Sequence, residues 1–319
     1  MNNTGSVAAD LVALRKALAK TRANPFDNRS AKPWRPALDI AFDWALVFLA
    51  VLAVCCLGWI ASPFAIFVIA NRQRALGNLL HDAGHQNLFR SRAVNDGVAS
   101  LCIAPALFND LGRYRDFHFR HHAVLGVHGR DPDKIAVQSV NGRTWWPTFS
   151  QELFSRANWT SSIAGHLAQG GVGWRARAFI FGWWCGFAAL LMTCTEPRFA
   201  LTFFVLWMTA RATVFHFITM FREMCDHFGL EPGGIYSYTR DIVVPLAWRW
   251  IVHPHQNCYH LTHHLLPSVP YHQLPAAQKA LEALPDYARR AVVCRAYFLG
   301  GKAVVRLRGV EARLSCARS

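Results

Sequence analysis

The stretch LDIAFDWALVFLAVLAVCCLGWIASPFAIFVIA, residues 38–70, sets the fold class because it is apolar over more than one membrane-crossing length. From residue 40 onward it contains one charged side chain, Asp43. A spanning helix needs about 20 apolar residues. Gly58 and the Ser62-Pro63 pair interrupt the middle of the stretch. We therefore predict a helical hairpin, not one long span.

Two further apolar stretches extend this hairpin to four predicted spans. Residues 178–194 and 199–210 contain no charged side chain, and the short turn TEPR separates them. The predicted spans are one at about 38–57, a second from about 60 onward, and two more at about 176–194 and 199–218. The composition agrees: 53% of the 319 residues are hydrophobic and only 17% are charged, where a soluble domain has about a quarter. So many apolar stretches are hard to bury without lipid.

The flanking segments complete the predicted domain organisation. Residues 1–37 form a cytoplasmic amphipathic segment, residues 38–280 the membrane domain, and residues 281–319 a basic cytoplasmic segment. The predicted helix at 10–22, capped by Asp10, either lies on the membrane surface or packs on the cytosolic part. Residues 93–108 are apolar but short, which favours a re-entrant or interfacial segment. Because the first apolar stretch begins after residue 30, we expect no cleaved leader.

Charge and cysteine content exclude several classes of protein. None of the nine cysteines shows CxxC spacing, so we predict neither a disulfide scaffold nor an iron–sulfur or zinc-ribbon module. The formal charge of +15 fits either an acidic partner or the positive-inside rule. In the four-span topology only Arg198 of the 34 basic residues falls in an outer turn. We therefore predict that both termini and the large polar face are cytoplasmic, with no nucleic-acid partner.

Histidines gather on that face in three short boxes. HDAGH spans residues 81–85, HFRHH spans 118–122 and HLTHH spans 260–264, while His227 follows the last predicted span. Residues i, i+3 and i+4 share one face of a helix, so each box directs its imidazoles one way. The boxes and His227 together offer more imidazoles than one tetrahedral zinc can use. They suit two ions, and imidazole-rich sites accept iron, copper or zinc.

These boxes, in this order around two hairpins, resemble those of the membrane fatty acid desaturase/hydroxylase superfamily. HHLLPSVPYHQL, residues 263–274, and RDPD, residues 130–133, are similar to stretches of the same family. The resemblance covers about residues 38–280. It implies an all-α integral membrane fold, with four transmembrane helices in two hairpins and a cytoplasmic helical cap that carries the boxes.

The resemblance also implies a di-iron centre and its ligands. The implied ligands are His81, His85, His118, His121, His122, His227, His260, His263 and His264. Asp82, Glu223 and Asp226 are possible outer partners of these ligands, although an ion pair with a neighbouring arginine would explain Glu223 equally well. No catalytic residue beyond the ligands is implied.

Some features depart from relatives in this superfamily. The first box is HxxxH, with one residue fewer than in many acyl-CoA desaturases, and the third begins with His where front-end desaturases have Gln. EPGG at 231–234 lacks the histidine of a haem-binding HPGG. We therefore expect no fused cytochrome, and a separate donor of the ferredoxin, rubredoxin or cytochrome type.

The other histidines have simpler interpretations. We assign His128 and His166 to surface or loop positions. His216 lies within the fourth predicted span, where it is a functional candidate or makes one polar contact between helices. His253 and His255 flank a proline, which spoils a helical panel, and we expect them to be structural or to contact the ligands.

The predicted function is O2-dependent desaturation of a lipid- or carrier-linked acyl chain. A hydroxylase or ketolase acting on an apolar lipid, a carotenoid or a small biosynthetic metabolite remains open, because the same ligands serve both reactions. A metal transporter would need ionisable residues lining a path through the spans, which hold mainly Asp43, Arg211 and His216. A haem carrier would need paired histidines on facing spans, and the sequence does not place them there.

Overall fold

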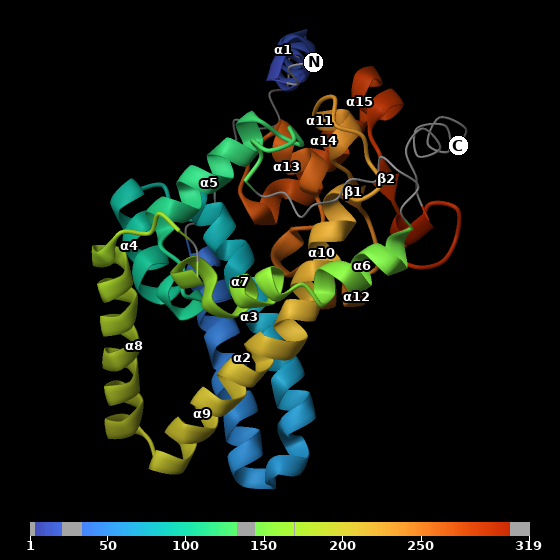
Figure 1. The fold of residues 1–319 in the computed structure, drawn as a ribbon. Helices are drawn as coiled ribbons and strands as arrows, with labels where there is room; N and C mark the ends of the chain where they lie inside the picture. The colour runs from blue at the N-terminus through green and yellow to red at the C-terminus, as the bar shows by residue number, and fades with distance from the viewer. Residues whose placement is uncertain (1–3, 21–33, 133–143, 169, 307–319) are drawn as a thin grey trace. The chain divides into compact units, whose positions relative to one another are not determined.

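The computed structural model describes residues 4–20, 34–132, 144–168 and 170–306, and helices dominate these residues (Figure 1). Contacts divide the chain into two compact units, each assembled from separate segments. Unit 1 comprises residues 1–31, 116–152 and 221–319. Unit 2 comprises residues 32–115 and 153–220.

Unit 2 is built on the predicted hairpin. Helix α2 (Arg35–Leu57) and helix α3 (Ser62–Gly84) pack side by side, and Gly58 turns the chain between them with φ at 80°, a value that suits glycine. A short 3₁₀ turn at Trp59–Ala61 completes the connection. Arg72 donates to Asp43 at 2.8 Å inside the hairpin, and both side chains are buried. The pairing explains how an apolar helix tolerates a carboxylate.

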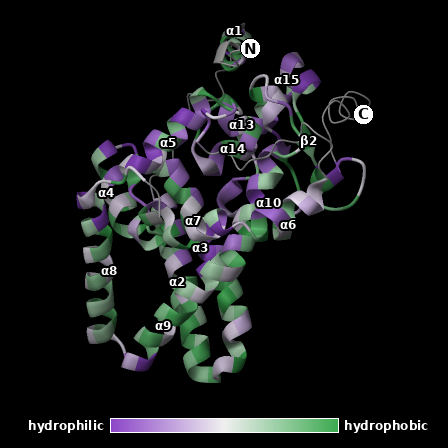
Figure 2. Ribbon diagram, viewed as in Figure 1, coloured by the Kyte–Doolittle hydropathy of each residue, from purple (hydrophilic) through white to green (hydrophobic). Residues whose placement is uncertain are grey.

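The second pair of long helices also begins as predicted. Helix α8 (Trp174–Cys194) is followed by α9 (Pro197–Ala210), a π-helical segment at Arg211–Phe215 and α10 (His216–His227), the last reaching into unit 1. Among the described residues, the helices long and apolar enough to cross a membrane are α2, α8 and the continuous stretch Pro197–His227. Helix α3 is not among them because its second half is polar (Figure 2). The span predicted from residue 60 onward therefore stays a prediction.

The segment predicted to be re-entrant folds as helix α4 (Arg92–Cys102) and a 3₁₀ turn at Pro105–Leu107. Side chains from the long helices of unit 2 donate hydrogen bonds to backbone carbonyl groups of this segment. The indole N–H groups of Trp44, Trp183 and Trp184 donate to the carbonyls of residues 102, 101 and 105 at 3.0, 2.8 and 3.0 Å. A segment without regular structure needs such donors when it lies out of contact with water.

Arg211 secures the same turn from the π-helical segment. It donates to the carbonyls of Ile163 at 2.6 Å and Leu107 at 2.7 Å. Ile163 belongs to helix α7 (Arg156–Ala164), which a 3₁₀ turn at Gly165–Ala168 follows. Through these two hydrogen bonds Arg211 links helix α7 and the turn at Pro105–Leu107 to the long helix. This buried cation therefore has a structural role.

In unit 1 the N-terminal helix α1 (Thr4–Lys20) packs on protein. Val7, Asp10 and Leu14 are buried. The Asp10 carboxylate accepts from the backbone N–H of Ile235, at 2.8 Å, and from Arg290, at 2.5 Å. Of the two predicted positions for this helix, the structure shows packing on protein, against helix α11 (Ile235–Tyr238) and helix α13 (His260–Leu265). The Asp10–Arg290 contact joins it to helix α15 (Pro285–Arg290). Residues 21 and 22 of the predicted helix lie outside the described residues.

The rest of unit 1 consists of short helices and one pair of strands. Helix α5 (Leu111–Ala123) enters this unit from unit 2. The other helices are α6 (Trp145–Leu153), α12 (Leu246–Val252), α13 (His260–Leu265) and α14 (Leu274–Glu282). Further 3₁₀ turns lie at Pro254–Gln256, Tyr271–Gln273 and Val304–Arg306. Strand β1 (Asp241–Ile242) runs parallel to β2 (Val293–Cys294), with Asp241 opposite Val293.

Asp241 connects this strand pair to the helix that carries the third histidine box. Its carboxylate accepts from the backbone N–H of Thr262 at 3.0 Å, from the Thr262 hydroxyl at 2.6 Å and from the Tyr287 hydroxyl at 2.7 Å. Burial raises the pKa of Asp241 to about 6 although these hydrogen bonds favour the carboxylate. Helix α13 has only six residues, so this anchor, not helix length, holds its imidazoles in place.

Candidate metal centre

Imidazoles from the second and third boxes and His227 gather inside unit 1 in two clusters. Cluster A contains His118, His122 and His263, and cluster B contains His121, His227, His260 and His264. Within each cluster the potential ligand atoms lie within 4.8 Å of one another. HxxHH spacing accounts for the division on α5, because His118 and His122 are one turn apart while His121 points elsewhere.

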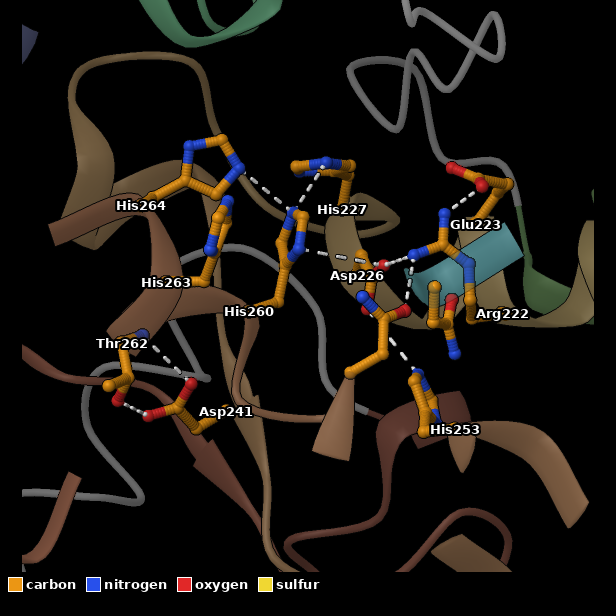
Figure 3. A network of polar contacts seen from close by, with 12 residues as sticks. Arg222, Glu223, Asp226, His227, Asp241, His253, His260, Thr262, His263 and His264 are labelled. Atoms are coloured by element: carbon orange, nitrogen blue, oxygen red, sulfur yellow. Dashed lines mark hydrogen bonds and ion pairs between the residues drawn. The ribbon is translucent and has the colours of Figure 1, made fainter. Parts of the chain in front are cut away.

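The Nε2 atoms in each cluster converge. In cluster A, the His122 Nε2 atom lies 3.0 Å from that of His118 and 3.1 Å from that of His263. In cluster B, the His260 Nε2 atom lies 3.0 Å from that of His227 and 3.1 Å from that of His264. Figure 3 shows the three cluster B rings of α10 and α13 turned toward one another.

Hydrogen bonds between histidines cannot account for this convergence. A neutral ring nitrogen carries either one hydrogen or one lone pair, so it makes one good hydrogen bond. The Nε2 atoms of His122 and His260 each face two others. Nitrogens bound to one ion at about 2.1 Å from it lie roughly 3 Å apart. The donor atoms in both clusters therefore fit metal ions.

Backbone and carboxylate partners prepare two cluster B rings as ligands. The His227 Nδ1 atom lies 2.8 Å from the Tyr238 carbonyl, and the His121 Nδ1 atom lies 2.9 Å from the Asp131 carboxylate. Both oxygens accept, so each Nδ1 atom carries the hydrogen and donates it. The lone pair of each neutral ring is then on Nε2, the atom that faces the cluster.

Asp131 is the partner that sequence reasoning missed. Its second carboxylate oxygen accepts the Gly126 N–H at 2.7 Å. Burial opposes ionisation of Asp131, but the hydrogen bonds from His121 and Gly126 lower its pKa below the ordinary value. The RDPD stretch was the available signal, because it follows the second box closely. Asp133 of this stretch lies outside the described residues.

Asp226 connects cluster B to a buried polar network (Figure 3). Its carboxylate lies 3.8 Å from the His260 Nδ1 atom, 3.5 Å from the His253 Nε2 atom and 2.9 Å from Arg222. The His253 Nδ1 atom accepts from or donates to the Tyr297 hydroxyl at 2.7 Å. At 3.8 Å the Asp226 carboxylate is beyond hydrogen-bond distance of the His260 ring, so its role as an outer partner of a ligand stays a prediction.

The other two acidic candidates have different surroundings. Glu223 forms an ion pair with Arg222, which corresponds to the alternative considered for it. Asp82 is buried, and its carboxylate lies 4.0 Å from the Nδ1 atom of the adjacent His81.

The first box lies in unit 2, at the end of α3. His81 belongs to the last turn of the helix and His85 caps it, with ring centroids 5.2 Å apart. The Arg115 guanidinium donates to the carbonyls of Ala83 and Gly84 at 3.2 and 3.0 Å, fixing the backbone of the box. Assignment of this pair as ligands stays a prediction.

The remaining histidines divide as expected except for one. His128 is exposed, and both His216 nitrogens are engaged, by the Ser162 hydroxyl and the Leu153 carbonyl at 2.8 Å each. The structure therefore supports the interhelical contact for His216. His166, predicted at a surface or loop position, lies in the 3₁₀ turn at Gly165–Ala168. Its ring is buried, not at the surface, and its Nδ1 atom accepts the Asp110 N–H at 3.2 Å. His255 packs against the Tyr271 ring.

Burial keeps the cluster imidazoles in the state that binds metals. It lowers the pKa of His260 and His264 well below the ordinary value, and the neighbouring imidazoles add to the effect for His264. Both rings are therefore neutral at pH 7, with lone pairs available. All-imidazole donors suit iron, copper or zinc better than magnesium or calcium, which prefer oxygen ligands.

Comparisons with known proteins agree on one family. The family model described as fatty acid desaturase matches residues 57–296. Dihydrorhizobitoxine desaturase of Bradyrhizobium elkanii is 27% identical over 288 residues, which cover 83% of this chain and 80% of that protein. Fatty acid desaturase 3 of Homo sapiens is 34% identical over 91 residues, which cover 28% of this chain and 19% of that protein.

Proposed function

The chain belongs to the fatty acid desaturase family and is an oxidoreductase, and on this premise we propose that it is an O2-dependent di-iron desaturase of an acyl chain. The observation that carries the proposal is the pair of imidazole clusters in unit 1, in which Nε2 atoms of different elements converge at 3.0 to 3.1 Å. Two separate clusters suit two ions.

Nine histidines would hold the irons under this proposal. Clusters A and B supply seven of them, and the first box supplies His81 and His85. Bound iron would supply the oxidising power to remove two hydrogens from neighbouring carbons, with O2 reduced to water by these hydrogens and by two electrons and two protons from outside. The Asp131 carboxylate and the Tyr238 carbonyl would orient the His121 and His227 rings and fix their tautomers.

The candidate membrane spans favour a lipid-like substrate. In the part of the chain that the structure describes, three helices have the length and composition of membrane spans, and apolar chains concentrate in the membrane. We also propose the cytoplasmic orientation of the clusters, from the distribution of basic residues, and a separate ferredoxin-, rubredoxin- or cytochrome-type electron donor.

A second substrate class is favoured by a specific observation. The match to dihydrorhizobitoxine desaturase extends over 80% of that protein, whereas the match to human fatty acid desaturase 3 extends over 19%. Desaturation of a small biosynthetic molecule such as dihydrorhizobitoxine is therefore the second candidate. Hydroxylation or ketone formation on the same centre is a third outcome for the experiment below.

Product analysis separates these candidates. The chain is expressed under iron-replete conditions in a host whose lipids are then profiled by mass spectrometry, with and without added dihydrorhizobitoxine. New double bonds in acyl chains support the first candidate. A product about two mass units lighter than dihydrorhizobitoxine, which corresponds to the loss of two hydrogens, supports the second.

The control is the same host carrying His263→Ala, which removes one cluster A ligand. Products that persist with this variant come from the host. A product that has gained an oxygen atom, instead of losing two hydrogens, would show that the reaction is hydroxylation. The absence of any iron-dependent product would contradict the oxidase assignment.

A further inference from the structure

A short helix in unit 1 exposes apolar side chains on almost every side. Helix α12 has the sequence LAWRWIV. The exposed fractions of Leu246, Trp248 and Trp250 are 58%, 43% and 45% in the part of the chain that the structure describes. A helix that is apolar all round is normally buried in protein or lipid. We therefore expect that another surface, of protein or lipid, covers these side chains.

The one charge on α12 does not counter this pattern. Arg249 turns toward the protein, where it donates to the Gln256 side-chain carbonyl at 3.2 Å and to the Tyr259 hydroxyl at 3.3 Å. The outer face of the helix therefore carries leucine, alanine and tryptophan only. Solvent-facing helices place their charges outward instead.

Neighbouring exposed residues extend the apolar surface. Trp146 on α6 is 52% exposed and Leu299 is 75% exposed. The Trp146 and Trp248 rings both contact Phe298, with ring centroids 6.3 and 5.6 Å apart. We call this surface the aromatic collar; its members are Trp146, Leu246, Trp248, Trp250 and Leu299.

The collar is fixed to one level of the long helix Pro197–His227. Phe298 stacks on Phe221 of that helix at 5.6 Å, and Trp145 and Phe149 of α6 contact the same ring at 6.0 Å. The helix has 31 residues, about 46 Å at 1.5 Å per residue. The hydrocarbon core is about 30 Å thick, and the charged residues Arg222, Glu223 and Asp226 lie at the His227 end of the helix. This end is therefore the one that we expect outside the core.

We propose that the aromatic collar lies in the interfacial layer of the membrane, between lipid headgroups and acyl chains. Tryptophan concentrates in this layer because its ring is apolar and its N–H group finds polar partners there. The inference rests on the membrane placement that belongs to the proposed function. It adds a second membrane contact, made by the histidine-bearing unit itself.

The collar sets the level of cluster B. His227 follows Phe221 by six residues, about 9 Å along the helix at 1.5 Å per residue. The ligand rings of cluster B then lie just outside the apolar layer. A substrate carbon that reacts at cluster B must therefore reach this level.

Depth-dependent quenching tests the collar. The full chain is reconstituted in phosphatidylcholine nanodiscs whose acyl chains carry bromine either near the headgroup or near the chain end. Subtracting the emission of a Trp146→Phe, Trp248→Phe, Trp250→Phe variant from that of the unchanged protein isolates the collar signal. Bromine near the headgroup should quench this signal roughly twofold more than bromine near the chain end, and aqueous iodide should leave it unquenched.

Trp145→Phe is the matched control, because Trp145 adjoins Trp146 but is only 3% exposed. Its difference signal should respond weakly to all three quenchers. If the triple variant does not fold, as judged by circular dichroism, the single variant Trp250→Phe gives the same comparison.

Two outcomes would overturn the proposal. Quenching by iodide without quenching by bromolipids would show that the collar faces water and is open to a soluble protein partner. Stronger quenching from the chain end would place it deep in the bilayer. Neither outcome depends on bound iron, so failure of the collar and failure of the oxidase assignment are separate results.

Discussion

The orientation of the His121 ring depends on Asp131, whose carboxylate accepts from the His121 Nδ1–H and from the Gly126 N–H. Helical spacing identifies the histidines of the boxes in the sequence, because positions i, i+3 and i+4 share one face of a helix. No such rule connects Asp131 to His121, ten residues earlier, because the intervening chain turns through Gly126 with φ at 71°. Asp241 was hidden for the same reason, since its partners Thr262 and Tyr287 are distant in sequence.

Replacing Asp131 with asparagine should lower metal affinity about 10- to 100-fold. The amide has one accepting oxygen where the carboxylate has two, so it cannot serve both the His121 Nδ1–H and the Gly126 N–H. Competition of the purified protein with a chelator measures the change. Asp116→Asn, at an exposed position on the same helix as His121, should leave affinity unchanged; an equal loss in both variants would remove Asp131 from the site.

His166 should make stability fall in acid. Burial lowers its pKa to about 4, from an ordinary value of 6.5. Between these values the unfolded state binds a proton that the folded state excludes, so the free energy of unfolding decreases as pH falls from 6.5 toward 4. The loss is roughly 3 kcal/mol at 1.36 kcal/mol per pKa unit.

Denaturant unfolding in detergent at pH 7 and pH 4.5 tests this dependence. His166→Asn keeps an oxygen that can accept the Asp110 N–H but has no group that titrates in this range, so it should lose less stability over the interval. Identical losses in the variant and the unchanged protein would assign the acid sensitivity to other groups.

At the scale of elements, apolar length predicted the helices better than it predicted their connections. Helices α2 and α8 appear where uninterrupted apolar stretches require them, and Gly58 turns the hairpin as expected. The turn after α4 depended on donors from Trp44, Trp183, Trp184 and Arg211. These contacts join residues far apart in sequence, which periodicity does not report.

Removing one of these donors should destabilise the turn. Trp184→Phe keeps a ring to stack on Phe108, 5.1 Å away, but leaves the Pro105 carbonyl without its indole donor. We expect a cost of about 1–3 kcal/mol, read as a lower melting temperature in detergent. Trp174→Phe, 74% exposed at the start of α8, is the matched control; equal melting temperatures for both variants would exclude the capping role.

At the scale of the whole molecule, the predicted orientation follows from charge. Basic residues concentrate on the side of the polar segments, and the turn between α8 and α9 carries Arg198 alone. The positive-inside rule then predicts that this turn lies outside the cell and the histidine clusters inside. Among the described residues, hydropathy marks α2, α8 and the stretch Pro197–His227 as candidate spans. The second predicted span, in α3, combines an apolar half with a polar half that ends at the first box.

Cysteine labelling measures this orientation. Cys194 is exposed at the end of α8, so a variant that retains only this cysteine should react with a membrane-impermeant maleimide in intact cells. A variant with Asp286→Cys as its only cysteine should react only after permeabilisation. The reverse pattern would invert the topology.

Iron content is the most direct test of the central claim, that two imidazole clusters hold two iron ions. The detergent-purified protein should contain about two irons per chain by elemental analysis, one for each cluster. His263→Ala in cluster A and His264→Ala in cluster B should each lower the content, and the double variant should lose both, whereas His128→Ala at an exposed position should keep them. A single zinc, or iron that is unaffected by the double substitution, would contradict the account.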